Sequence, residues 1–219
     1  MGLQLYGHPF SSYHQKVAVA LYEDATPFDL RLLGPDDPET GAQCAALWPL
    51  KRMPLLLDAG RMVVESSVII EYLGRHHPGP ARLIPDDPDI ALEVRKMDRI
   101  FDNYVMTPMQ RIVGDFIRTR EVRDAHGVAE MHALLEQAYA WLDGVMAQRT
   151  WGAGEAFSLA DCAAAPALFY ADWVRPIPQA HGRLRAYRAR LLARPSVARA
   201  VDEARPYRKL FPPGAPDRD

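Results

Sequence analysis

The sequence places a proline and an acidic-serine pair where they could bind the ends of an extended ligand. Pro54 begins an apolar run, and Glu65-Ser66 opens a helical pattern shortly afterwards. A proline at the start of a strand donates no backbone hydrogen bond, and a cis Met53–Pro54 bond would turn the preceding backbone outward toward a ligand. The first turn of a helix favours an anion, so Ser66 could bind a carboxylate while Glu65 pairs with an ammonium group. The alternative is that Pro54 only starts a strand and the pair only caps a helix.

A second candidate site is the turn between the first predicted strand and the first predicted helix, Gly7-His8-Pro9-Phe10-Ser11-Ser12-Tyr13. The hydroxyl and amide donors of Ser11 and Ser12 would lie near the positive N-terminus of that helix, where they could stabilise a thiolate. The alternative is an ordinary helix cap, in which a serine hydroxyl only satisfies a backbone N–H.

The first eighty residues predict a small α/β domain that would position both segments. Strands are expected where apolar residues alternate or run continuously, and helices where they recur at helical spacing. The expected strands are residues 3–6, 28–32, 54–57 and 62–64, and the expected helices are residues 12–23 and 65–73. The predicted order is β-α-β-(loop)-β-β-α, so the long connection before the third strand is expected to be a loop.

The character of the chain changes after Pro78-Gly79-Pro80. Residues 1–78 are expected to form the α/β domain, residues 79–88 a linker and residues 89–205 an all-helical domain. Long helical patterns without a convincing strand occupy residues 89–120, 124–148, 158–174, 180–192 and 195–204. Residues 206–219 are expected to form a tail, and its last part, Pro212-Pro213-Gly214-Ala215-Pro216-Asp217-Arg218-Asp219, has nothing to bury and is expected to fray.

Composition excludes several function classes. The 219 residues are 48% hydrophobic, and 26 Lys+Arg balance 28 Asp+Glu, so no basic field favours nucleic acid. Apolar runs stay shorter than the roughly 18 residues of a membrane span, and the N-terminus lacks a secretory pattern, so a cytoplasmic protein is expected. Cys44 and Cys162 are far apart and His8, His76 and His77 lack ligand spacing, so neither a disulfide framework nor a metal site is expected.

These residues resemble the cytosolic glutathione transferases over about residues 3–205. The first domain is similar to the family's thioredoxin-like, glutathione-binding domain, and the second to its all-α domain. Leu5-Tyr6-Gly7-His8-Pro9-x-Ser11 followed by Lys16-Val17 is similar to the serine-type signature of the phi and tau classes. Ser11-Ser12 and Pro49-Leu50-Lys51-Arg52-Met53-Pro54 also resemble the zeta pattern.

The resemblance implies a role for each matching residue. Met53 precedes the family's cis-proline, here Pro54, and its backbone would pair with the cysteinyl group of glutathione. Glu65 and Ser66 match the acidic-serine pair that binds the γ-glutamyl group. The contacts to the glycyl carboxylate stay open, because Trp48 replaces the Asn of several classes and Glu39-Thr40 replace the basic or His contact of phi-type members. Arg52 is the candidate for part of this role. Phe157-Ser158-Leu159-Ala160-Asp161 matches the family's capping box, which makes Ser158 and Asp161 structural.

The resemblance also identifies a thiolate donor. The family's catalytic serine lies about six residues before the first-helix valine, which points to Ser11 before Val17, with Ser12 as a neighbour that assists. The implied mechanism is a hydrogen bond from the Ser11 hydroxyl to the glutathione sulfur, which lowers the pKa of the thiol. Position 11 is not cysteine, which argues against the branches of the family that exchange disulfides. Glutathione would be the co-substrate, and no metal or redox cofactor is needed.

Three functions follow from this resemblance. The favoured one is a glutathione transferase acting on small apolar electrophiles; the others are a glutathione-dependent isomerase of maleyl-type acids and a non-catalytic relative that binds partners. The electrophile pocket would lie between the domains, although core packing is the alternative for each candidate. Those candidates are Phe10, Tyr13, Tyr104, Met109, Arg111, Tyr170 and Trp173. The family further implies a homodimer, and the physiological electrophile stays open.

Overall fold

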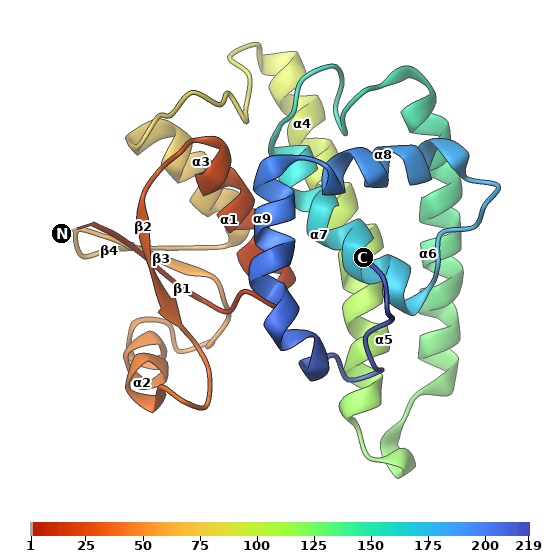
Figure 1. Cartoon of the computed structure of the whole chain (residues 1–219), viewed down its shortest axis with the longest axis horizontal. Helices are drawn as coiled ribbons and strands as arrows, with labels where there is room; N and C mark the ends of the chain where they lie inside the picture. The colour runs from red at the N-terminus through yellow and green to blue at the C-terminus, as the bar shows by residue number, and fades with distance from the viewer. Residues whose placement is uncertain (1) are drawn as a thin grey trace.

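The computed structural model describes residues 2–219 and confirms the expected α/β domain followed by helices. Figure 1 shows the sheet on one side and the helical domain on the other. The four strands lie in the order β2-β1-β3-β4. Strand β1 (Leu3–Gly7) pairs in parallel with β2 (Phe28–Leu32) and antiparallel with β3 (Leu55–Asp58), which pairs antiparallel with β4 (Arg61–Val64).

Helices cover both faces of this sheet. α1 (Ser12–Glu23) and α3 (Ser66–His76) share a core with Leu5 and Leu56 on one face. Alternate strand residues point to the opposite face, where Tyr6 and Leu55 pack with Cys44 of a further helix.

That further helix, α2 (Pro38–Leu47), corrects the expectation of a loop before the third strand. The Asp37 carboxylate caps the helix by accepting from the Thr40 N–H at 2.9 Å, and Pro38 occupies the first helical turn. Only Thr40 and Cys44 of the helix are buried, so its apolar pattern is too sparse to be recognised as a helix from the sequence.

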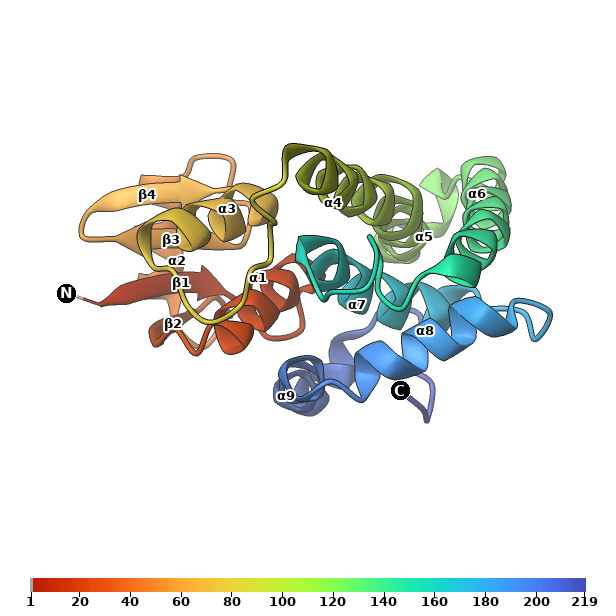
Figure 2. The same cartoon turned by 90° about the horizontal axis from the view of Figure 1, so that it is seen from above.

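The helical domain surrounds a buried central helix. Its α-helices are α4 (Pro88–Ile100), α5 (Thr107–Ile117), α6 (Ala125–Val145), α7 (Leu159–Val174), α8 (Gly182–Leu192) and α9 (Pro195–Ala204). Residues of α7 are buried along almost its whole length. Seen from above, α1 lies between the sheet and α7 (Figure 2), and a single apolar core runs through both domains.

The predicted helix over residues 89–120 is interrupted by a π-helical segment, η1 (Phe101–Met106), between α4 and α5, and it ends at Ile117. Pro108 has no N–H, so a regular α-helix through this point would leave a carbonyl without its partner. The Thr107 N–H instead bonds the Asp102 carbonyl five residues earlier, the spacing of a π-turn. This widened turn carries Asp102 and Asn103, which become important in the cleft described below.

The capping box expected at residues 158–161 is present. Asp161 is fully buried and accepts from the Ser158 N–H at 2.9 Å, the Gly152 N–H at 2.7 Å and the Tyr187 hydroxyl at 2.6 Å. The carboxylate therefore fixes the start of α7 and the loop before it, which is a structural role.

The expectation of a frayed tail is wrong. Phe211 is buried against the core, directly after a 3-10 helix (η4, Arg205–Leu210). Asp219 pairs with Arg205 and with Arg208, the latter at 3.0 Å, and Arg218 pairs with Asp172 of α7. Residues 212–219, whose proline-rich sequence suggested nothing to bury, are thus held by ion pairs directly after a buried aromatic anchor. Within residues 2–219, no helix is long and apolar enough to cross a membrane.

Candidate active site

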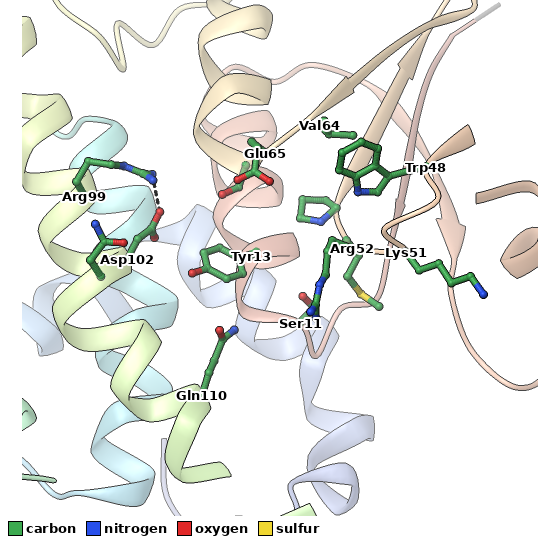
Figure 3. Close-up of a pocket in the computed structure, with 14 residues that line it drawn as sticks. Ser11, Tyr13, Trp48, Lys51, Arg52, Val64, Glu65, Arg99, Asp102 and Gln110 are labelled. Atoms are coloured by element: carbon green, nitrogen blue, oxygen red, sulfur yellow. Dashed lines mark hydrogen bonds and ion pairs between the residues drawn. The ribbon is translucent and has the colours of Figure 1, made fainter. Parts of the chain in front are cut away.

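A cleft of about 630 Å³ lies where the two domains meet (Figure 3). The α/β domain provides most of its lining: Ser11, Tyr13, Trp48, Lys51, Arg52, Met53, Pro54, Val64, Glu65 and Ser66. The helical domain contributes Arg99, Asp102, Asn103 and Gln110. The structure therefore brings Ser11, the Met53-Pro54 segment and the Glu65-Ser66 pair together from three separate parts of the sequence.

The Met53–Pro54 peptide bond is cis, and Pro54 lies buried immediately before β3. The paired residues of the sheet end at Leu55, which is opposite Tyr6 on one side and Val64 on the other. Met53 therefore lies beyond the paired part of the sheet, at the wall of the cleft. Backbone that continues a strand beyond its last paired residue can hydrogen-bond with another extended chain.

Glu65 and Ser66 form the N-terminal end of α3. Glu65 adopts φ 69°, in the left-handed region that is costly for a residue other than glycine and is often retained at functional sites. Its carboxylate makes no capping hydrogen bond to the helix and is exposed to the cleft. Ser66 begins the helix, so its hydroxyl and the free first-turn N–H groups offer an anion site beside an acidic side chain.

Ser11 and Ser12 lie in different surroundings. Ser11 is the N-cap of α1, where its Oγ accepts from the His14 N–H at 3.4 Å, and it lines the cleft. Ser12 is 7% exposed, and its Oγ accepts from the Gln110 side-chain amide at 3.5 Å. The Ser11 oxygen accepts the helix-capping hydrogen bond through one lone pair. Its hydroxyl proton is not used in that bond and can point into the cleft.

A buried ionic cluster lies beside the cleft and joins the two domains. The Lys16 ammonium of α1 lies 2.5 Å from Asp98 and 2.7 Å from Asp102, and it donates to the Ser67 hydroxyl at 2.9 Å. Arg99 also pairs with Asp102 at 2.6 Å. Burial raises the pKa of the Asp102 carboxyl, while Lys16 favours its charged form. The cluster fixes the helical wall of the cleft against α1 and α3.

Tyr13 is the one aromatic side chain of the predicted electrophile pocket that lines the cleft. Figure 3 shows its hydroxyl directed from α1 toward the helical-domain side. Burial and, secondarily, the Asp102 charge raise the pKa of Tyr13 to about 12. The phenol is therefore protonated at neutral pH and available as a hydrogen-bond donor.

The other predicted pocket residues lie elsewhere. Phe10 packs edge-on against Tyr170 with ring centroids 5.4 Å apart, and both belong to a buried aromatic cluster with Trp173. Tyr104 faces a separate hollow between η1 and α6, and Arg111 lines another beside Arg118. Met109 is buried in the core. The structure therefore does not gather these residues into one pocket: Tyr170 and Trp173 lie on α7, which is buried along almost its whole length, and the others belong to different elements.

The cysteines lie apart from this chemistry. Cys44 and Cys162 are both buried free thiols, and burial raises the pKa of each. A thiol held protonated is a poor nucleophile. Among the described residues, no group of three or more His, Cys, Asp or Glu side chains is arranged to hold a metal ion.

Sequence reasoning missed the helical wall of the cleft. Arg99, Asp102, Asn103 and Gln110 lie on a helical run whose polar residues look like an ordinary solvated face. Trp48 and Val64, which border the predicted segments, were not identified as lining residues either. A usable signal was Pro108, because a proline within a long helical pattern marks a local change of the helix.

Two family models match this chain, one in each domain. Residues 5–81 match the model for the glutathione S-transferase N-terminal domain, and residues 125–190 match the model for the glutathione S-transferase C-terminal domain. Among solved structures, the chain is similar to a glutathione S-transferase from Methylobacterium radiotolerans in complex with glutathione sulfonate. The two are 31% identical, with a TM-score of 0.78 and coverage of 91% of this chain and 94% of that one.

Curated relatives give a mixed set of names. A Nicotiana tabacum protein named probable glutathione S-transferase is 29% identical over 114 residues, which is 52% of this chain and 47% of the relative. The chain thus aligns with about half the length of the tobacco relatives it matches. A stringent starvation protein A homolog from Coxiella burnetii is 24% identical over 207 residues, 92% of each chain.

Proposed function

Because the chain belongs to the cytosolic glutathione transferase superfamily, we propose that it binds glutathione in the interdomain cleft and transfers its thiolate to an electrophile. The observation that carries this proposal is the convergence of Ser11, the Met53-Pro54 segment and Glu65-Ser66 on one cleft. Ser11 would bind the sulfur of glutathione, the Met53 backbone its cysteinyl unit, and Glu65-Ser66 its γ-glutamyl end. The cytoplasm, where the glutathione pool is kept reduced, is the compartment we propose for the reaction.

Charge complementarity supports one orientation of glutathione. The Glu65 carboxylate would pair with the γ-glutamyl ammonium, and the first turn of α3 at Ser66 would bind the adjacent α-carboxylate. The backbone of Met53 would pair with the cysteinyl unit. Arg52 and Lys51, both exposed at the other end of the cleft, would bind the glycyl carboxylate. This orientation directs the sulfur toward Ser11.

The mechanism we propose is thiolate stabilisation by Ser11. A free thiol has a pKa of about 8.5, and lowering it by two units requires about 2.7 kcal/mol of differential stabilisation. A hydrogen bond to a charged group provides about 1.5–3 kcal/mol, and a helix N-terminus adds about 0.3–1 kcal/mol. The Ser11 hydroxyl and the start of α1 can therefore together account for the required energy. Ser12 would act only through the position of its neighbour.

The side chains that the helical domain contributes to the cleft indicate the chemical class of the electrophile. The sequence predicted small apolar electrophiles, but all four residues that the helical domain contributes to the cleft are polar. Polar walls retain water unless the ligand replaces its hydrogen bonds. We therefore propose an electrophile that carries a hydrogen-bonding group next to the reacting carbon, a class that includes maleyl-type acids as isomerisation substrates.

The test combines binding and turnover. Retention on immobilised glutathione, a calorimetric binding signal, and turnover of a chromogenic aryl halide are expected together. Absence of binding at millimolar glutathione would contradict the proposal.

A non-catalytic, partner-binding protein is the second candidate. The similarity to a stringent starvation protein A homolog, which covers 92% of both chains, supports this candidate. Glutathione binding without turnover of any electrophile, and without ionisation of the bound thiol, would support this candidate over the first.

We also propose a homodimer, as the family implies. The hollow between η1 and α6 is lined mainly by apolar residues, among them Ile100, Leu134 and Ala138. Two large side chains in it, Tyr104 and Trp141, are 51% and 48% exposed. A second copy of the chain is the occupant we propose for this hollow, since an exposed apolar patch commonly marks an interface. Sedimentation at several concentrations tests the proposal.

A further inference from the structure

Two buried side chains hold the backbone immediately before Ser11. The Gln15 side-chain amide donates to the Pro9 carbonyl at 2.9 Å, and the Tyr170 hydroxyl donates to the Phe10 carbonyl at 3.0 Å. The same Gln15 amide nitrogen donates to the Tyr170 hydroxyl at 2.9 Å. Both carbonyls that precede the proposed thiolate donor are therefore fixed by side chains.

The donor and acceptor in each hydrogen bond of this cluster can be assigned from its partners. Carbonyl oxygens only accept, so the Gln15 atom facing Pro9 must be the amide nitrogen. The Tyr170 hydroxyl accepts from that nitrogen and has its single proton left for Phe10. Gln15 and Tyr170 are each 3% exposed, so water cannot replace either bond. Burial also raises the pKa of Tyr170, which keeps the hydroxyl protonated as a donor.

The cluster crosses the domain boundary. Gln15 lies on α1 beside the turn that it holds, whereas Tyr170 lies on α7 of the helical domain. The Phe10 ring packs edge-on against the Tyr170 ring, and Phe211 of the C-terminal tail lies with ring centroids 6.5 Å from Phe10 and 6.3 Å from Tyr170. The helical domain thus holds both the side chain and the carbonyl of Phe10.

We propose that Tyr170 and Gln15 are positioning residues that set the Ser11 hydroxyl against the glutathione sulfur. Tyr170 then acts through the turn rather than as a wall of the electrophile pocket. A displacement of about 1 Å at a catalytic group can cost about 100-fold in rate, so a turn held at two consecutive carbonyls is a sensitive point. This inference rests on the proposed function, because it concerns ionisation of the bound thiol.

A merely structural role is the competing explanation, and the chain offers a matched control. Tyr139 of α6 is fully buried, and its hydroxyl donates to the Arg175 carbonyl at 3.1 Å, away from the cleft. Tyr139→Phe and Tyr170→Phe therefore each delete a buried hydroxyl that donates to a backbone carbonyl, and Tyr170→Phe also removes an acceptor of the Gln15 amide. Both are expected to lower the thermal unfolding midpoint.

The experiment measures the pH dependence of bound-thiolate absorbance together with steady-state kinetics for both variants and the unmodified protein. Tyr170→Phe is expected to raise the midpoint of thiol ionisation by about one pH unit and to lower kcat about tenfold. Its KM for glutathione is expected to stay within about twofold, because the residues proposed to bind glutathione are untouched. Tyr139→Phe is expected to leave the ionisation midpoint and kcat unchanged.

A Tyr170→Phe midpoint equal to that of Tyr139→Phe would overturn the inference. If Tyr170→Phe does not fold, Gln15→Met removes both amide bonds at similar side-chain volume, and the same upward shift is required of it. If the unmodified protein binds glutathione without ionising it, the proposed function fails instead, which the first measurement of the series reveals.

Discussion

The Lys16 ammonium lies 2.5 Å from the Asp98 carboxylate, and the two side chains are only 1% and 2% exposed. Lys16 belongs to α1 of the first domain and Asp98 to α4 of the second. The domains are therefore joined by charges as well as by a shared apolar core. Asp102, on the wall of the cleft, pairs with the same ammonium at 2.7 Å, so one side chain contacts both the domain interface and the wall of the site.

Replacing this lysine tests the interface. Lys16→Met is expected to cost about 3–5 kcal/mol of unfolding free energy, because it removes the buried cation from between two buried carboxylates and leaves only the half-exposed Arg99 to pair with them. Chemical denaturation measures the loss. Arg75→Met is the control, since Arg75 is 73% exposed and lies 3.5 Å from Glu71, and such pairs contribute less than about 1 kcal/mol. Equal losses for the two variants would contradict the assignment of the cluster as a link between the domains.

Substitution of Ser11 and substitution of Ser12 are expected to affect thiol ionisation differently. Ser11→Ala is expected to raise the pH midpoint of bound-thiolate absorbance by about one to two units, toward the free-thiol value, with a small change in glutathione affinity. Ser12→Ala is the control, because Ser12 is buried against Gln110. If Ser12→Ala shifts the midpoint and Ser11→Ala does not, Ser12 is the donor and the proposed mechanism is wrong.

Gln110 tests the polar character of the co-substrate. Gln110→Leu is expected to lower kcat/KM about three- to tenfold for an electrophile with an adjacent carbonyl or carboxylate, the value of one lost hydrogen bond. Turnover of an apolar aryl halide should be unchanged or faster. Gln148→Leu, at an exposed position outside the cleft, is the control. A loss of similar size for both electrophiles would contradict a role for Gln110 in selectivity.

The sequence predicted the parts of the site that are marked by local chemistry. Ser11, Pro54 and Glu65-Ser66 each stand at the boundary of a strand or helix, where residue type and backbone geometry constrain each other. Gln110 could not be found in this way, because a polar side chain on an exposed helix face carries no sign of what faces it. The sequence prediction placed Tyr170 in the electrophile pocket for a related reason. An aromatic side chain suits a pocket wall and a core equally well, and only the tertiary packing shows that Tyr170 belongs to the core.

His14 makes stability depend on pH. It is 2% exposed, and within the described residues its Nδ1 has no hydrogen-bond partner. Burial, with a smaller effect of His8, lowers the pKa of His14 to about 4. The unfolded chain, with an ordinary pKa of about 6.5, then binds the proton more readily, so stability falls as the pH drops from about 6.5 to about 4. The expected loss is about 2 kcal/mol between pH 7 and pH 5.

Urea unfolding at the two pH values checks this prediction. His14→Leu is expected to remove most of the difference, because leucine has no proton to bind in either state. The acidic groups are common to both proteins, so their contribution cancels in the comparison. A pH dependence in His14→Leu as steep as in the unmodified chain would assign the acid sensitivity to other groups.

Trp141 tests the proposed homodimer. Its side chain is 48% exposed in the hollow between η1 and α6, where a second copy would bury it. A charge at the centre of an apolar interface is left without a partner on association, so Trp141→Glu is expected to weaken dimerisation by at least about 100-fold, equivalent to about 2.7 kcal/mol. Val122→Glu, at an apolar side chain that is 62% exposed outside this hollow, is expected to leave association unchanged. Sedimentation separates the outcomes: a Trp141→Glu dimer as tight as the original means that the hollow is not the interface, and a monomeric unmodified chain means that the homodimer itself is wrong.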